Sequence, residues 1–180
     1  MIEMLIVVTL IGIGSAVAFW KLDIAQFQAT GDMQGIGSAL IAAQREAVAH
    51  QCNMIVTFDT AAHVVHLITD SNNNGVQDPG EHETVYALGD RVRFSMGATP
   101  PGDAGPGPIT FTQVTNGLPS VTFFRNGAAS QAGGLYITSV REAETSDPRY
   151  AAQTRLVEVA RATGHADWWH YTGTQWVRGF

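Results

Sequence analysis

The chain has 180 residues and a formal net charge of −6. Its ten Lys and Arg residues are scattered, so the composition argues against nucleic acid as the main partner, because phosphate backbones require clustered cations. The length fits one domain plus an N-terminal tail or anchor. The one cysteine, Cys52, excludes an intramolecular disulfide and is expected to be a small buried apolar residue.

The most informative stretch lies at the start of the chain. Residues 4–20 carry no charge, Lys21 ends the run, and Glu3 precedes it. Such a run is nearly long enough to cross a bilayer as a helix. A carboxylate at membrane depth costs about 3 kcal/mol, so Glu3 is expected to have a partner. A removable secretory signal is disfavoured, since the run has no basic region before it and no small-residue cleavage site after it.

A family resemblance rests on these residues. Ile2-Glu3-Met4-Leu5-Ile6-Val7-Val8, followed by Leu10-Ile11-Gly12-Ile13, resembles the N-terminus of type IV pilins and type II secretion pseudopilins. In this resemblance Met1 fits the third residue of the mature segment. It implies a short basic leader that a prepilin peptidase removes, and an N-methylated first residue. The alternative is an ordinary signal anchor.

The resemblance also implies roles for three residues. Glu3 is expected to pair with the N-terminal amine of a neighbouring subunit. Gly12 and Gly14 each weaken the helix by about 1 kcal/mol but allow close helix packing. The predicted filament-assembly residues are therefore Glu3, Gly12 and Gly14. The implied partners are copies of this chain or other pilins, together with a prepilin peptidase, an assembly platform and an ATPase. The implied location is the inner membrane as a single pass, and after assembly an extracellular filament or a periplasmic pseudopilus.

Three regions follow one another along the chain. They are a hydrophobic membrane or filament-core helix (1–22), its amphipathic continuation (23–52), and an extracellular β-rich globular domain (53–180). Three glycines, at 31, 35 and 37, cost about 3 kcal/mol of helix propensity and predict an interruption near residues 30–32. The helix spacing predicts one buried stripe made of Ile24, Phe27, Ile36, Leu40, Ala43, Ala47 and Val48.

The rest of the chain favours short strands. Alternating residues predict a hairpin of 54–58 and 64–68. Residues 97–108, rich in Pro and Gly, predict a loop, and 140–153 an exposed excursion. The expected fold class is α+β: a pilin-like fold with a long N-terminal hydrophobic helix packed on an antiparallel β-sheet region. The remaining strand candidates are 84–88, 91–96, 109–112, 121–124, 135–139, 155–160, 168–171 and 176–178.

Two further segments resemble the FimT/GspH branch of these families. Residues 40–49 resemble the end of its first helix, with Gln44 where that branch often has Ala. Residues 154–164 resemble its closing strand. DNA-binding members carry a Gly-Arg-x-Arg cluster there, whereas here the order differs and Glu158 intervenes. The resemblance therefore does not extend to DNA binding.

The sharpest local motif runs from residue 70 to residue 81. It fits D-x-[DN]-x-[DN]-G-x₅-E in every position, with Gly75 at the sharp turn. Calcium takes six to eight oxygen ligands, and three acids suggest modest affinity. The alternative is a metal-free Asn-Gly turn in a long hairpin. The predicted Ca²⁺ ligands are Asp70, Asn72, Asn74, the Val76 carbonyl, Asp78 and Glu81.

No catalytic pattern emerges from the sequence. His63 and His66 are spaced poorly for a shared metal, and no nucleophile or phosphate-cradling motif is present. The expectation is therefore a structural filament subunit, not an enzyme. A minor or tip pilin that binds DNA or a surface ligand is the alternative, and an enzyme domain on an anchor is the third hypothesis.

Overall fold

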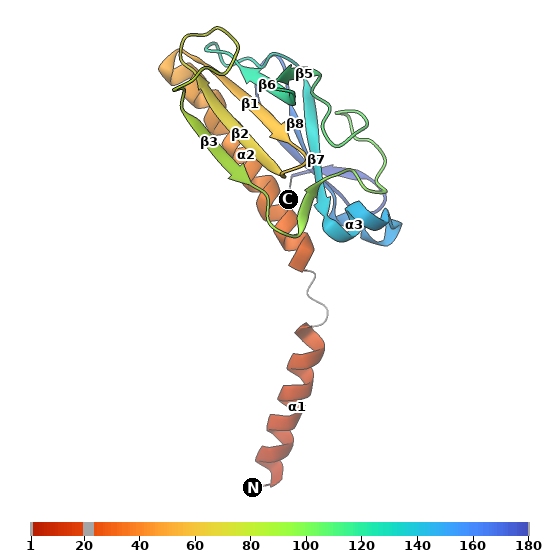
Figure 1. The fold of residues 1–180 in the computed structure, drawn as a ribbon. Helices are drawn as coiled ribbons and strands as arrows, with labels where there is room; N and C mark the ends of the chain where they lie inside the picture. Colours follow the sequence, from red (N-terminus) through yellow and green to blue (C-terminus); the bar gives the residue numbers. More distant parts are fainter. Residues whose placement is uncertain (1, 20–23, 180) are drawn as a thin grey trace.

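The computed structural model describes residues 2–19 and 24–179. Two helices come first, α1 (Ile2–Phe19) and α2 (Ile24–His50). Figure 1 shows α1 extending beyond the globular part, whereas α2 lies against the strands. The packed helix is thus α2, and the expectation of a helix packed on antiparallel sheets is confirmed for this segment.

In the part of the chain that the structure describes, ten strands form two five-stranded sheets, and every pairing is antiparallel. The first sheet has the order β3-β2-β1-β6-β5 and the second β10-β9-β8-β7-β4. Strands of both sheets contribute to one core with α2. The bounds in the first sheet are β1 (Asn53–Asp59), β2 (Val64–Asp70), β3 (Glu83–Ala87), β5 (Gln113–Thr115) and β6 (Leu118–Phe123). Those in the second are β4 (Val92–Phe94), β7 (Gly133–Ser139), β8 (Arg155–Val159), β9 (Ala166–Tyr171) and β10 (Trp176–Arg178).

The buried face of α2 repeats at alternating steps of four and three residues, which keeps it on one side of a helix. The predicted stripe is right from Ile36 to Ala47 and wrong at its ends. Ile24, Phe27 and Val48 are exposed, the Phe27 side chain by 70%. The residues that face the sheets are Ala29, Met33, Ile36, Leu40, Ala43 and Ala47.

The predicted interruption near residues 30–32 is wrong, because α2 is helical without a break from Ile24 to His50. Two of the glycines serve packing. A Cβ at Gly35 would lie 2.0 Å from the Tyr86 hydroxyl oxygen, and one at Gly37 would lie 1.9 Å from Trp168 Nε1. Both aromatic side chains therefore pack against α2 at positions where any residue larger than glycine would clash. Their burial against the helix offsets the loss of helix propensity.

The β1–β2 hairpin is confirmed, and Cys52 is buried as expected. The strand predicted at 109–112 is wrong, since Ile109 makes only an isolated bridge to Leu135. The strand is β5, joined to β6 by Asn116 and Gly117, both with positive φ. An Asn-Gly pair between two strands is a known hairpin signal, so the sequence contained this turn.

The polar segment at 140–153 is folded, and only part of it is exposed as predicted. It forms α3 (Val140–Thr145), capped by the Ser139 side chain, and a 3₁₀ helix (Pro148–Gln153), capped by Asp147. Glu142, a residue of α3, is buried at 0% exposure, and Ala151 and Gln153 of the 3₁₀ helix are buried too. Residues 154–164, which resemble a closing strand, do not hold that place here, because their strand β8 is the central strand of its sheet. The loop at 97–108 is confirmed, and Tyr136 holds it by accepting from Gly102 N–H at 2.8 Å and donating to the Gly105 carbonyl at 2.8 Å.

Candidate assembly helix and candidate calcium loop

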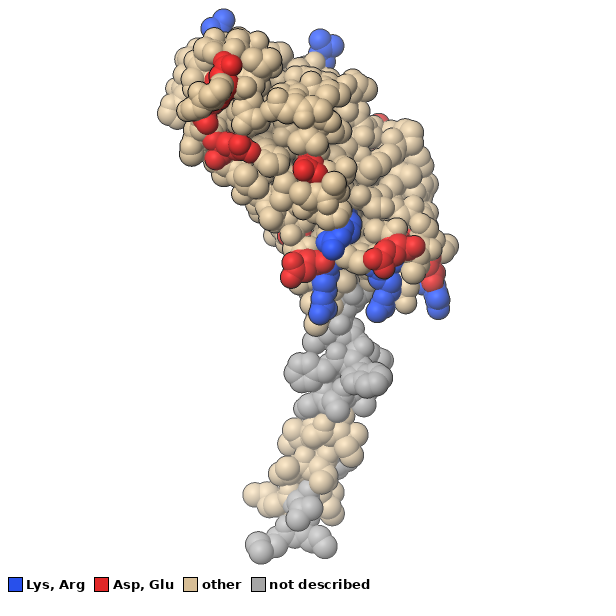
Figure 2. Space-filling view, in the orientation of Figure 1, with Lys and Arg blue, Asp and Glu red and all other residues tan. Residues whose placement is uncertain are grey.

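The assembly residues predicted from the sequence all lie within α1. Glu3 is exposed and takes part in no ion pair of the described residues. Apolar side chains of the same helix face outward too: Met4 is 74% exposed and Val8 68%. The described part of α1 is uncharged on the face that Figure 2 shows, whereas acidic and basic side chains mix at the nearby end of the globular part. This apolar helix surface has no partner among the described residues of its own chain.

The described part of α1 leaves room for close packing. An added Cβ at Gly12 would meet no atom within 4 Å. Gly14 lies in the same helix, two residues on. Across the described ranges, 2–19 and 24–179, no helix combines the length and hydropathy expected of a membrane-crossing span.

The candidate calcium loop connects β2 to β3. It begins at Asp70, the last residue of β2, whose side chain is fully buried. Asp70 accepts hydrogen bonds from the backbone N–H of Asn74 (3.0 Å) and of Gly75 (2.8 Å). Gly75 has φ +81°, which glycine adopts without strain. The sharp turn predicted from the sequence is thus built around the first acid of the motif.

The other acids close the loop. Glu81 accepts from Ser71 N–H and Asp78 N–H, both at 2.9 Å, and so ties the beginning of the loop to its end. Asp78 Oδ2 accepts from the side-chain amides of Asn72 (2.7 Å) and Asn74 (2.6 Å). All six predicted ligand residues therefore lie in one hydrogen-bonded network, five of them through their side chains. Val76 joins it through its backbone N–H, which donates to Asn74 Oδ1 at 2.9 Å, and not through its carbonyl.

The loop contains the oxygen-bearing side chains that calcium binds, but they are not arranged to coordinate an ion. Asn72 and Asn74 turn amide N–H groups toward Asp78, whereas calcium requires their oxygens. Within the part of the chain that the structure describes, no group of three or more His, Cys, Asp or Glu side chains is placed to hold a metal ion. The three loop carboxylates also have no Lys, Arg or His partner among the described ion pairs. Their charge is left to hydrogen-bond donors.

Sequence reasoning did not identify the structural role of Gln44. Gln44 on α2 donates from Nε2 to the carbonyl of Gly127 (2.8 Å) and to that of Thr163. It thereby joins the β6–β7 turn to the β8–β9 turn. The signal was present, because Gln44 was the one departure noted in a segment resembling the FimT/GspH branch.

Comparison with known proteins finds similar structures but no similar sequences. No family model and no curated protein matches the sequence. A structure of the minor pseudopilin EpsH from the type 2 secretion system of Vibrio cholerae is similar, with a TM-score of 0.50 at 13% identity. The match covers 78% of this chain and 95% of that one. A second structure of the same protein matches with a TM-score of 0.47 at 11% identity, over 79% of this chain and 96% of that one.

The first of these likenesses, with a TM-score of 0.50, shows the fold. The sequence resemblance of the first residues and this structural likeness agree. The chain has a pilin-like fold of the kind found in type II secretion pseudopilins.

Proposed function

We propose that this protein is a structural subunit of a pseudopilus or type IV pilus that polymerises through α1. The observation that carries the proposal is the exposed apolar surface of α1, on a chain whose remainder has the fold of a minor pseudopilin. Within a monomer this surface stabilises nothing. Packed among the same helices of neighbouring subunits, it would be removed from water at about 25 cal/mol per Å².

Glu3 has a specific role in this proposal. A carboxylate in an apolar helix bundle is costly unless an opposite charge neutralises it. A neighbouring N-terminal amine supplies that charge, and the pair fixes the register between subunits. Before assembly the same helix lies in the inner membrane, and afterwards in the core of an extracellular filament or a periplasmic pseudopilus. The partners are copies of this chain or other pilins.

The test is incorporation of variants into filaments sheared from cells. Glu3→Ala should leave a folded protein that enters filaments poorly, because the unpaired amine of the neighbour would remain in an apolar environment. Glu144→Ala, which removes an exposed carboxylate from α3, is the matched control and should enter normally. Equal incorporation of the two variants would exclude Glu3 as the assembly residue.

We also propose that the 70–81 loop binds Ca²⁺ with modest affinity. The support is chemical: three carboxylates share one loop without a cationic partner, and like charges at close range disfavour one another. Asp70, Asp78 and Glu81 would supply charge, and Asn72, Asn74 and the Val76 carbonyl neutral oxygens. A bound cation would offset the repulsion and clamp β2 to β3 in a chain without a disulfide.

Thermal unfolding decides between this proposal and a metal-free turn. Calcium at a hundredfold excess over its Kd should raise the free energy of unfolding by about 2.7 kcal/mol. Magnesium should substitute poorly, since it demands a tighter octahedron and retains its waters. Asp70→Ala should lose the calcium response. If chelation leaves the melting temperature unchanged and calorimetry detects no binding at millimolar calcium, hydrogen bonds alone hold the loop.

A further inference from the structure

A groove lies where β1 begins and β6 ends. Figure 1 shows these strand ends on the side of the globular part away from α1. It consists of two adjoining hollows that share Phe124 and Asn126. The first, of about 320 Å³, is lined by Asn53, Asn73, Phe124, Arg125 and Asn126. The second, of about 400 Å³, is lined by Phe124, Asn126, Ala128, Ala129, Arg161 and Ala162. We call the two hollows together the Phe124 groove.

The walls of the groove are fixed by hydrogen bonds between segments far apart in the sequence. The β6–β7 turn closes on itself through Phe124 N–H to the Ala128 carbonyl and Gly127 N–H to the Phe124 carbonyl, both at 2.8 Å. Ala129 N–H donates to the Arg161 carbonyl at 2.9 Å, which joins this turn to the β8–β9 turn. Gln44 holds both turns from α2. The groove is therefore a built feature of the fold.

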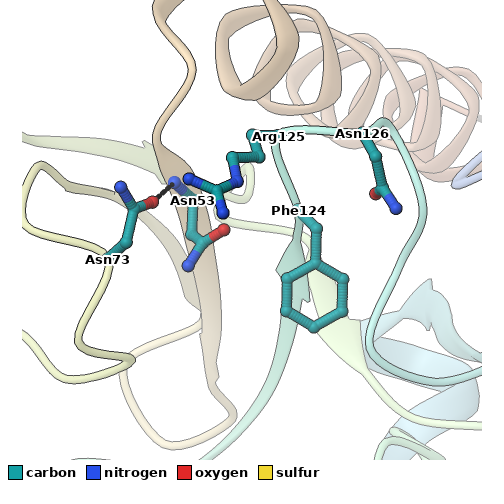
Figure 3. A pocket seen from close by; sticks show the side chains of 5 residues that line it. All are labelled: Asn53, Asn73, Phe124, Arg125 and Asn126. Atoms are coloured by element: carbon teal, nitrogen blue, oxygen red, sulfur yellow. Dashed lines mark hydrogen bonds between the residues drawn. The ribbon is translucent and has the colours of Figure 1, made fainter.

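Several hydrogen-bond donors that line the first hollow have no partner within the described part of the chain. Figure 3 shows the Arg125 guanidinium beside the Asn53 side chain, with the Asn73 side chain next to them. Asn73 uses its Oδ1 to accept from Asn53 N–H at 2.7 Å. In the described part of the chain, the Arg125 guanidinium, the Asn53 side-chain amide and Asn73 Nδ2 have no hydrogen-bond partner. The hollow thus offers N–H groups and a positive charge together.

The second hollow also carries a positive charge, from Arg161. Arg161, like Arg125, is exposed and forms no ion pair among the described residues. Among the other arginines, Arg149 pairs with Asp147, Arg178 with Asp167, and Arg155 with Thr30 and backbone carbonyls. Arg45 and Arg91, outside the groove, are exposed and form no ion pair among the described residues either. The Phe124 side chain, 38% exposed, lies between the two hollows and adds an apolar surface.

We infer that the Phe124 groove binds an acidic peptide segment of another protein, with carboxylates on both sides of an apolar residue. Arginine and amide N–H groups match carboxylate oxygens, and charge-assisted hydrogen bonds of this kind are about twice as strong as neutral ones. The apolar residue between the carboxylates packs on Phe124. Nucleic acid fits less well, since a chain of net charge −6 with two arginines at the site offers little for a phosphate backbone. The inference goes beyond the filament role and does not require polymerisation.

The test is NMR of the isotopically labelled full chain in non-ionic detergent, with two peptide probes. One is an acetylated, amidated Gly-Glu-Leu-Glu-Gly peptide, and the other carries Gln in place of both Glu residues. The Glu peptide should shift the side-chain amide resonances of Asn53, Asn73 and Asn126 and the ring resonances of Phe124. The Gln peptide should bind at least about tenfold more weakly, because it lacks the charge.

Variants of the chain assign the effect to the groove. Arg125→Gln combined with Arg161→Gln should weaken binding of the Glu peptide at least about tenfold. Both side chains are exposed, so the variant should keep the unperturbed spectrum of the core. Arg45→Gln, which removes an exposed arginine on α2 outside the groove, is the matched control and should bind as the parent does.

Three results would overturn the inference. The first is equal binding of the Glu and Gln peptides, and the second is full binding by the double arginine variant. The third is tighter binding of a short single-stranded oligonucleotide than of the Glu peptide at the same resonances, which would assign the groove to nucleic acid. Failure of the chain to enter filaments would leave this test unaffected, and a negative result here would leave the proposed filament role intact.

Discussion

The glycines of α2 predict opposite effects for one and the same substitution. At Gly31 an added Cβ meets nothing within 4 Å, and the residue is exposed. Gly31→Ala should therefore gain helix propensity at no packing cost, about 1 kcal/mol. At Gly37 the same Cβ would lie 1.9 Å from Trp168 Nε1, 2.6 Å from Cε2 and 3.0 Å from Cζ2.

These contacts set the magnitude for Gly37→Ala. Three ring atoms of a rigid indole block the methyl group, so the ring or the helix must move. Overpacking of this kind costs about 1–3 kcal/mol, from which the gain of about 1 kcal/mol in helix propensity is subtracted. The net change should be a loss of up to about 2 kcal/mol.

Thermal unfolding of the full chain in detergent, followed by circular dichroism, measures both variants. In a protein of this size each kcal/mol shifts the melting temperature by about 2–4 °C. Gly31→Ala should raise it and Gly37→Ala should lower it or leave it unchanged. A rise of equal size in both variants would show that Trp168 does not depend on the missing Cβ, and would refute the explanation given for the unbroken helix.

Two further predictions concern the globular part. A fragment from Ala25 onward should be soluble and folded, because the core consists of α2 and the sheets; aggregation of that fragment under conditions where the full chain is well behaved would show that the core depends on α1. Burial raises the pKa of Glu142 above its ordinary value of 4.5, so the folded state holds this proton more tightly than the unfolded state, and the free energy of unfolding should fall as the pH rises above about 4.5. Glu142→Gln, compared with the parent by chemical denaturation between about pH 4 and 8, should flatten that fall, and an unchanged dependence of the unfolding free energy on pH would contradict the assignment.

The sequence contained the parts of this fold that depend on local pattern. The β1–β2 hairpin follows from alternating apolar residues between turn residues, and the loop at 97–108 from its prolines and glycines. The buried face of α2 followed from helix spacing as far as Ile36, Leu40, Ala43 and Ala47. These features require no knowledge of the neighbouring segments.

The features that the sequence concealed depend on what each residue meets in space. Gly35 and Gly37 weaken a helix in isolation, and only the close packing of Tyr86 and Trp168 against α2 explains why glycine stands at these two positions. Glu142 lies in a segment whose polarity predicted exposure, yet it accepts from Ala98 N–H at 2.7 Å in the interior. Tertiary contacts of this kind override local propensity.

The candidate sites divide in the same way. Glu3 and the 70–81 motif are continuous in sequence and were therefore visible. The Phe124 groove combines the start of β1, the loop after β2 and the turns after β6 and β8, which no spacing rule connects. Gln44 could be noted as a departure from a pattern, but its two carbonyl partners lie more than 80 residues away.

The central claim is that α1 packs against the same helix of other subunits. The direct measurement is photocrosslinking in assembled filaments from a benzophenone amino acid in place of Val8, whose side chain is 68% exposed on α1. The account predicts a crosslink to the N-terminal helix of another pilin, mapped by mass spectrometry, and its loss in cells that lack the assembly ATPase. Crosslinks confined to lipid, or to the globular part of the same chain, would contradict it.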